Sequence, residues 1–275
     1  MLTKLSITED FKAIPYLRDS KLMQTHKNEI EFASDKPNVI IGQNGSGKTA
    51  LLDTITLRFL CHFENHSRYK DSYIRTREAD QWWSTTGGWR KNQVWLDGLS
   101  TDSDNAPAAY FRPNHIPGNE KDIVTALMVY DCDAAKEYGN RTENKSTGEK
   151  STAMLADTYA ILNGSKQLMA PNIPKPRNVE YKTEYDKRLE YFHANIHFNE
   201  TGKPLVIMDE PERSLDGLQE MKLWKAILDS KTTQVIVATH SIFPILHPTL
   251  FNLIETENGY IKRLQKALNT ALQHL

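Results

Sequence analysis

A glycine-rich segment between two apolar runs has the residue types and the spacing to bind phosphate. Residues 42–49 read GQNGSGKT and match the pattern G-x-x-x-x-G-K-[ST] at every fixed position. The run 39–41 before it is typical of a strand and the run 50–55 after it of a helix, which is the context that this pattern requires. Glycines let backbone N–H groups turn toward a phosphate at the positive end of the following helix. The sequence therefore predicts a nucleoside triphosphate as the ligand.

Two side chains of this loop would add a charge and a metal ligand. Lys48 would supply a point charge to the terminal phosphates, and the Thr49 hydroxyl could ligate Mg²⁺. The residues that we expect to hold the phosphates are Gly42, Asn44, Gly45, Ser46, Gly47, Lys48 and Thr49.

Two carboxylates follow a second apolar run. Residues 205–208 read LVIM, as in a strand buried on both faces, and Asp209 and Glu210 come directly after them. We expect Asp209 at the end of this strand to lie beside the phosphate-binding loop and to hold the metal ion directly or through water. Glu210 would point elsewhere and could polarise the attacking water, so it is the candidate general base.

A histidine ends a third apolar run. Residues 235–238 read VIVA and lead through Thr239 to His240, one helix length (roughly residues 218–228) after the acidic strand. A single histidine after a strand is often only a cap or a turn residue. The spacing from the acidic strand favours a second role, in which His240 hydrogen-bonds the terminal phosphate.

Taken together, these motifs resemble those of the ATP-binding-cassette ATPases. Residues 214–216 (SLD) are similar to the D-loop of that family, and residues 145–149 (KSTGE) are similar to its signature peptide, L-S-G-G-Q. Ser146 and Gly148 fit the signature, whereas the other three positions depart from it. The S-x-G-E form looks like the soluble branch, which includes the structural-maintenance-of-chromosomes and RecF-like repair ATPases, the OLD-family ATPase domains and small ATPases of bacterial anti-phage systems.

The resemblance implies ATP as the nucleotide, Mg²⁺ as the metal, and a fold of the α/β P-loop NTPase class with a β-rich arm and a helical signature subdomain. It also implies a head-to-tail homodimer, in which Ser146, Gly148 and Glu149 of one subunit contact the ATP held by the other. Hydrolysis by the water that Glu210 polarises would then release the two subunits.

We interpret residues 1–275 as one such ATPase domain. The arm would span approximately residues 64–119, and the helical part approximately residues 120–203 with a proline-rich insertion. In the family a glutamine usually touches the metal or the water. Gln81 and Gln93 are candidates for it, although the strand-like run 108–111 could lead into that loop instead.

Composition limits the class of protein. The charge is balanced, with 34 basic and 35 acidic residues, so no overall field favours nucleic acid. No apolar run approaches the length that crosses a bilayer. With two cysteines and no export-type leader, we expect a cytoplasmic protein without a membrane partner.

The chain has little room for an effector after His240, so we expect an effector protein in trans, a nuclease or a toxin in phage defence or DNA repair. Nucleic acid is a possible further partner, because basic and aromatic residues interleave between residues 68 and 91. Two alternatives remain open, namely the ATPase subunit of a membrane transporter and a scaffold that binds ATP without hydrolysing it.

Overall fold

A six-stranded sheet in which all neighbouring strands run parallel forms the centre of the molecule. The computed structural model describes residues 1–63, 96–113, 144–145, 147–170, 173, 175–176, 178–182, 184–213 and 215–272. In spatial order the strands are β4 (His62–Phe63), β6 (Ala108–Phe111), β7 (Leu205–Asp209), β8 (Gln234–Thr239), β3 (Asn38–Ile41) and β9 (Asn252–Glu255). Every residue of β3, β6, β7 and β8 is buried, as expected for parallel strands with both faces covered.

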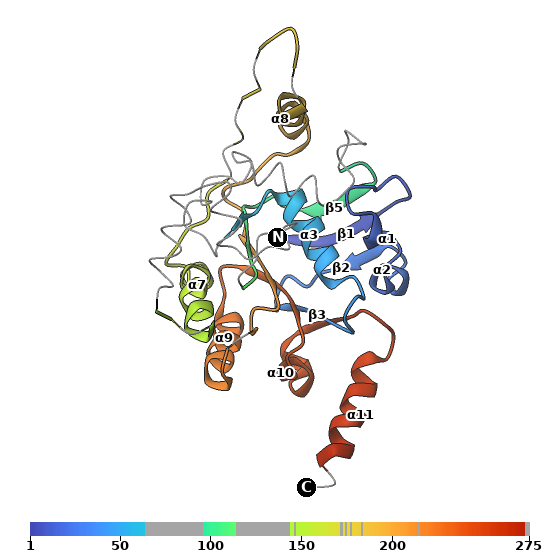
Figure 1. The fold of residues 1–275 in the computed structure, drawn as a ribbon, viewed down its shortest axis with the longest axis vertical. Coiled ribbons are helices and arrows are strands. Elements are labelled where there is room, and N and C mark those ends of the chain that lie inside the picture. The colour runs from blue at the N-terminus through green and yellow to red at the C-terminus, as the bar shows by residue number, and fades with distance from the viewer. Residues whose placement is uncertain are drawn as a thin grey trace.

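Three long helices pack on this sheet: α3 (Lys48–Phe59), α7 (Thr147–Leu162) and α9 (Gly217–Asp229). Helix α3 contacts β6, β7 and β8, whereas α7 contacts β7 and α9. In Figure 1, α3 lies on one side of the sheet, and α7 and α9 lie together on the other. All residues of α3 except Thr49 and Arg58 are buried, so this helix is covered on every side. The architecture confirms the predicted α/β fold of a P-loop NTPase.

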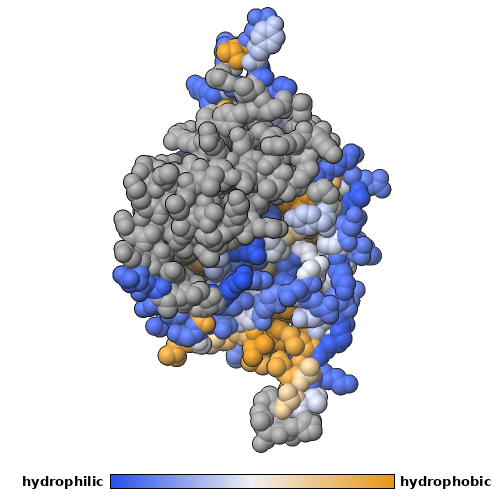
Figure 2. Space-filling view, viewed as in Figure 1, coloured by the Kyte–Doolittle hydropathy of each residue, from blue (hydrophilic) through white to orange (hydrophobic). Residues whose placement is uncertain are grey.

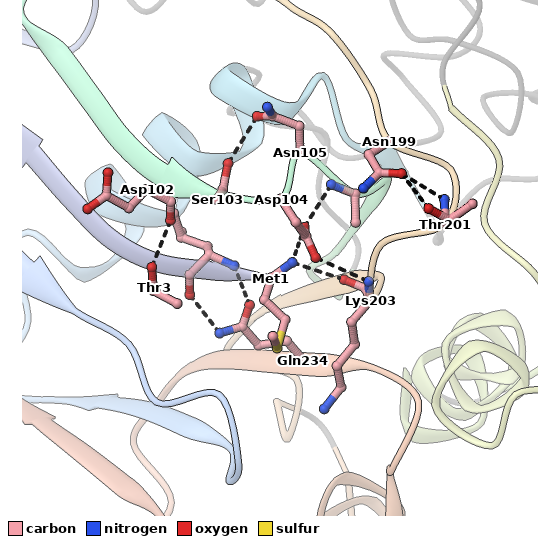
Figure 3. Close-up of polar contacts among 12 residues, drawn as sticks. Met1, Thr3, Asp102, Ser103, Asp104, Asn105, Asn199, Thr201, Lys203 and Gln234 are labelled. Atoms are coloured by element: carbon pink, nitrogen blue, oxygen red, sulfur yellow. Dashed lines mark hydrogen bonds and ion pairs between the residues drawn. The ribbon is translucent and has the colours of Figure 1, made fainter.

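A second sheet is antiparallel and has the strand order β2 (Glu29–Glu31), β1 (Leu2–Ile7) and β5 (Leu99–Ser103). The buried Gln234, at the start of β8, joins this sheet to the parallel one (Figure 3). Its side chain accepts a hydrogen bond from the Leu2 N–H at 2.6 Å and donates to the Leu2 carbonyl at 2.7 Å. The N-terminal ammonium also pairs with Asp104, so the first residues of the chain are fixed at this end of the sheet.

The charged stretch 12–28 contains two short helices, α1 (Pro15–Arg18) and α2 (Lys21–Thr25). Ser20 caps α2 by accepting a hydrogen bond from the Met23 N–H at 3.3 Å. Both helices are too short to show a helical repeat in the sequence, and the Ser20 cap stabilises α2 locally.

The remaining elements complete the described chain: α8 (Glu184–Asn195), α10 (Phe243–Leu246), the 3₁₀ helix η3 (Pro248–Leu250) and α11 (Tyr260–Leu272). Helix α11 extends away from the body of the molecule in Figure 1. Within the range expected for the arm, β5 pairs with β1 and β6 pairs with β7. Among the described residues, no helix has the length and apolar character needed to cross a bilayer.

Candidate functional site

The phosphate-binding loop connects β3 to α3, and close packing requires glycine at two of its positions. Gly47 has φ 104°, and a Cβ atom there would lie 2.5 Å from the Ser20 side chain. A Cβ atom at Gly42 would lie 1.5 Å from the Thr256 hydroxyl. Helix α2 is also bonded to the loop, because the Leu22 N–H donates to the Ser46 carbonyl at 3.0 Å. Chain segments from both termini therefore fix the shape of the loop.

Lys48 is folded back onto the loop. Its ammonium donates hydrogen bonds to the carbonyls of Gly42 at 2.8 Å and Gln43 at 3.0 Å. Burial lowers the pKa of Lys48, and the carboxylates of Glu210 and Asp209 partly oppose that shift. The charge is thus held at the place where the loop would receive a phosphate.

Thr49 and Asp209, the two predicted metal ligands, contact each other. The Thr49 hydroxyl donates to Oδ2 of Asp209 at 3.0 Å, although β8 lies between β3 and β7. Burial raises the pKa of Asp209 to about 6, and Arg112, the Thr49 hydroxyl and Lys48 act in the opposite direction. Oδ1 of Asp209 is buried and has no hydrogen-bond partner among the described residues.

These residues fit a magnesium ion. Mg²⁺ prefers oxygen ligands and is usually held by one or two carboxylates together with substrate phosphates. The buried, unpaired Oδ1 of Asp209 and the Thr49 hydroxyl supply oxygens of this kind. Among the described residues no group of three or more His, Cys, Asp or Glu side chains could hold a metal, so phosphate oxygens would have to complete the coordination.

The two candidate catalytic residues lie together at the ends of β7 and β8. Nε2 of His240 is 3.4 Å from Oε1 of Glu210. Burial and the nearby Lys48 lower the pKa of His240, so its imidazole is neutral at neutral pH and its contact with Glu210 is not an ion pair. Glu210 has φ 47°, a left-handed conformation that is strained for a non-glycine residue and that occurs often at functional sites.

Glu212 is a residue of the site that sequence reasoning missed. Its Oε1 accepts hydrogen bonds from the Thr239 hydroxyl at 2.7 Å and from the His240 N–H at 3.0 Å. This side chain ties the turn after β7 to the end of β8 and so fixes the position of Glu210 relative to His240. The signal was present in the sequence as a second acid, two residues after Glu210 in the run DEPE.

A hollow of about 510 Å³ lies over the phosphate-binding loop, and the α1–α2 segment forms its other wall. The residues that line it outside the loop and α3 are Tyr16, Asp19, Ser20, Lys21 and Glu210. The sequence did not predict this wall, because no motif marks residues 16–21. A second hollow of about 410 Å³ lies at the opposite end of β8 and contains none of the predicted site residues.

The structure describes only some of the residues that were predicted for the signature peptide and for the glutamine. Gly148 and Glu149 lie in the first turn of α7, whereas Ser146, Gln81 and Gln93 fall outside the described residues. Strand β6, the other candidate to lead into the metal-contacting loop, is followed by Arg112. Its Nε lies 3.3 Å from Oδ2 of Asp209.

Asp216, in the D-loop-like segment, caps the N-terminus of α9. Its side chain accepts a hydrogen bond from the Gln219 N–H at 2.9 Å, and Gln219 reaches back to the Asp216 N–H in a capping box at the start of α9. The neighbouring Ser214 lies outside the described residues.

Comparison with known proteins agrees with the geometry. Residues 18–95 match the model of a family described as an AAA domain, and the match spans α2, the phosphate-binding loop and α3. No curated protein matches the chain. The matched segment and the parallel sheet together support the P-loop NTPase fold for this chain.

Proposed function

We propose that this protein binds ATP with Mg²⁺ and hydrolyses it in a head-to-tail dimer that controls a partner protein. One observation carries the proposal: Lys48, Thr49, Asp209, Glu210 and His240 come from three separate segments of the chain and meet at one edge of the sheet. A phosphate-binding loop, a carboxylate for a metal and a second carboxylate beside it are the parts that phosphoryl transfer to water requires.

In the proposed reaction, the Lys48 ammonium leaves the carbonyls of Gly42 and Gln43 and pairs with the terminal phosphates. Thr49 and Asp209 would hold Mg²⁺, which supplies charge neutralisation when it is bound. A water oxygen bonds to the γ-phosphorus as the bond to the β-phosphate oxygen breaks, and Glu210 takes the proton of that water. Glu212 holds His240 at the end of β8. From this position the neutral imidazole of His240 can donate a hydrogen bond to a phosphate oxygen.

Tyr16 is well placed to contact the nucleotide base. Its side chain lines the same hollow as the loop, and the residue is 57% exposed although it is large and aromatic. Stacking of a base on an aromatic ring is worth about 1–3 kcal/mol in proteins that bind single-stranded nucleic acid. In our proposal the α1–α2 segment holds the base, and the loop holds the phosphates.

Exposed apolar residues support assembly with a second protein surface. Leu218 and Met221 lie on α9 just beyond Asp216, and Ile242 follows the site residue His240 by two positions. Leu246 and Leu250 are exposed as well, and Figure 2 shows an apolar patch over α10. We propose that the surface next to the D-loop-like segment faces a second copy of the chain, and that the effector, a nuclease or toxin, reads the ATP-dependent state.

A mixing experiment tests the dimer. A Lys48→Ala chain and a Ser146→Arg chain should each be inactive, while the mixed dimer retains one site with an intact loop and an intact signature. Partial ATPase activity should therefore reappear on mixing. Activity that fails to return in demonstrated mixed dimers would contradict the composite site. ATP binding without turnover in the wild-type protein would favour the scaffold.

A further inference from the structure

Arg112 contacts the carboxylate that the metal ion would use. Residues Phe111 and Met208 are partners in the parallel pair of β6 and β7, so Arg112 and Asp209 follow at the same level of the sheet. The Arg112 side chain is 21% exposed and that of Asp209 only 1%, and their atoms approach to 3.3 Å. A largely buried arginine thus serves as a counter-ion of a buried carboxylate.

The contact uses an oxygen that is already engaged. Oδ2 of Asp209 receives both the Arg112 guanidinium and the Thr49 hydroxyl, while Oδ1 has no hydrogen-bond partner among the described residues. Two further carboxyl groups, Asp53 and Glu210, are near enough to interact with the Arg112 charge. The guanidinium therefore lies beside a cluster of acidic groups.

The chemistry of arginine decides what this residue can do. A glutamine at the end of β6 could offer its amide oxygen to a metal, but a guanidinium has only donors and keeps its charge at all accessible pH values. A divalent cation at Asp209 would repel it. The guanidinium would then be drawn from Asp209 toward another anion at this edge of the sheet, and the γ-phosphate of the nucleotide is the anion that the phosphate-binding loop would place there.

We propose that Arg112 is an exchange residue: it neutralises Asp209 in the metal-free protein and passes to the terminal phosphate when Mg²⁺ binds Asp209. This inference rests on the proposed ATP and Mg²⁺ site. Mg²⁺ and Arg112 compete for one carboxylate, so the arginine sets the Mg²⁺ concentration that the protein requires. Because only ATP has a γ-phosphate, Arg112 also favours ATP over ADP.

The test compares nucleotide binding by the wild type, Arg112→Gln, Arg112→Lys and a control, Arg263→Gln. Arg263 makes an exposed ion pair with Glu257 at 2.8 Å. Arg263→Gln therefore also removes a guanidinium–carboxylate contact, but one that lies outside the proposed site. Binding of fluorescent ATP and ADP analogues is measured by anisotropy as MgCl₂ is titrated. An opposite charge within 4–6 Å shifts ionisation by one to three pKa units, so we expect the half-saturating Mg²⁺ concentration of Arg112→Gln to fall roughly tenfold.

We also expect Arg112→Gln to lose most of the preference for ATP over ADP and Arg112→Lys to keep part of it, while Arg263→Gln behaves as the wild type. An unchanged Mg²⁺ requirement would overturn the exchange at Asp209, and an unchanged ATP-to-ADP ratio would overturn the transfer to the phosphate. If the wild type binds no nucleotide, the proposed function fails.

Thermal unfolding with ADP and increasing MgCl₂ then tests the exchange at Asp209 separately, because ADP supplies phosphate oxygens for Mg²⁺ but no γ-phosphate for Arg112. Mg²⁺ should stabilise Arg112→Gln at a lower concentration than it stabilises the wild type, and equal concentrations would contradict the exchange. If Arg112→Gln does not fold, Arg112→Lys carries both measurements. Its half-saturating Mg²⁺ concentration should lie below that of the wild type, and equality would overturn the inference.

Discussion

The two ends of β8 differ in how well their buried polar groups are hydrogen-bonded. At the start of the strand, the buried Gln234 side chain makes three hydrogen bonds to backbone groups, two of them to Leu2 (Figure 3). Near its end, Oδ1 of Asp209 and Oε2 of Glu212 are buried and have no hydrogen-bond partner among the described residues, and Glu210 has a strained backbone. Hydrogen-bonded groups stabilise a fold, whereas unpaired and strained groups in a native protein are typical of functional sites. The first end thus holds the two sheets together, and the second is suited to chemistry.

Glu210→Gln, near the end of β8 that carries the site residues, should have the largest effect on turnover. The amide keeps the size of the side chain but cannot take a proton from water, so turnover should fall by about 10²–10⁴. ATP should still bind, and because ATP bridges the proposed dimer, light scattering should show a dimer with ATP but not with ADP. Wild-type turnover in this variant would remove Glu210 from the catalytic role, and an oligomeric state that ignores ATP would remove the bridging role.

At the opposite end, Gln234→Met should affect stability and leave nucleotide binding unchanged. The N–H and carbonyl of Leu2 would lose their buried partner, and each unsatisfied group costs about 1–3 kcal/mol. Urea unfolding should therefore show a loss of about 2–6 kcal/mol. Gln265→Met, which removes one half-buried hydrogen bond to Ile245, is the matched control and should cost less than about 1.5 kcal/mol. A large loss of ATP affinity in Gln234→Met would show that the two ends are coupled.

Lys48→Ala should reduce ATP affinity by about tenfold to a hundredfold, because a hydrogen bond to a charged group is worth about 1.5–3 kcal/mol. Titration calorimetry with ATP measures the effect. Lys225→Ala, which removes an exposed ion pair with Asp229 on α9, should bind ATP as the wild type does. Unchanged ATP affinity in Lys48→Ala would remove the loop from nucleotide binding.

The pH dependence of stability should report on Asp53, a buried acid on α3. Burial and the nearby Asp209 raise its pKa to about 8 from an ordinary value of 3.8. An acid whose pKa is raised in the folded state contributes stability below its unfolded pKa, and that contribution is lost as the pH rises through the folded pKa. The wild type should therefore lose stability between about pH 4 and pH 8.

Asp53→Asn cannot ionise, so its stability should match that of the wild type near pH 4 and exceed it near pH 8.5. We expect an excess on the order of 1–2 kcal/mol once the site relaxes around the charge. Urea unfolding at the two pH values measures it. Asp229→Asn, at an exposed carboxyl, should keep the wild-type profile. A parallel pH profile in Asp53→Asn would show that Asp53 is ionised in both states.

The sequence by itself determined the local parts of the site. The pattern of residues 42–49, the buried runs of β7 and β8 and the boundaries of α9 near residues 217 and 229 are all local, because they depend on the spacing of neighbouring residue types. Capping of α9 by Asp216 is likewise a short-range hydrogen bond. Such features can be predicted because their partners lie within a few residues.

Only the tertiary structure decided which parts meet. The strand order places β8 between β3 and β7, yet Thr49 still reaches Asp209 from α3. Arg112 reaches Asp209 from the end of β6. The α1–α2 segment forms one wall of the hollow, and no sequence motif predicted this wall. These contacts join residues that are far apart in the chain, so their energy depends on the burial and charge of the folded core, which local spacing does not specify.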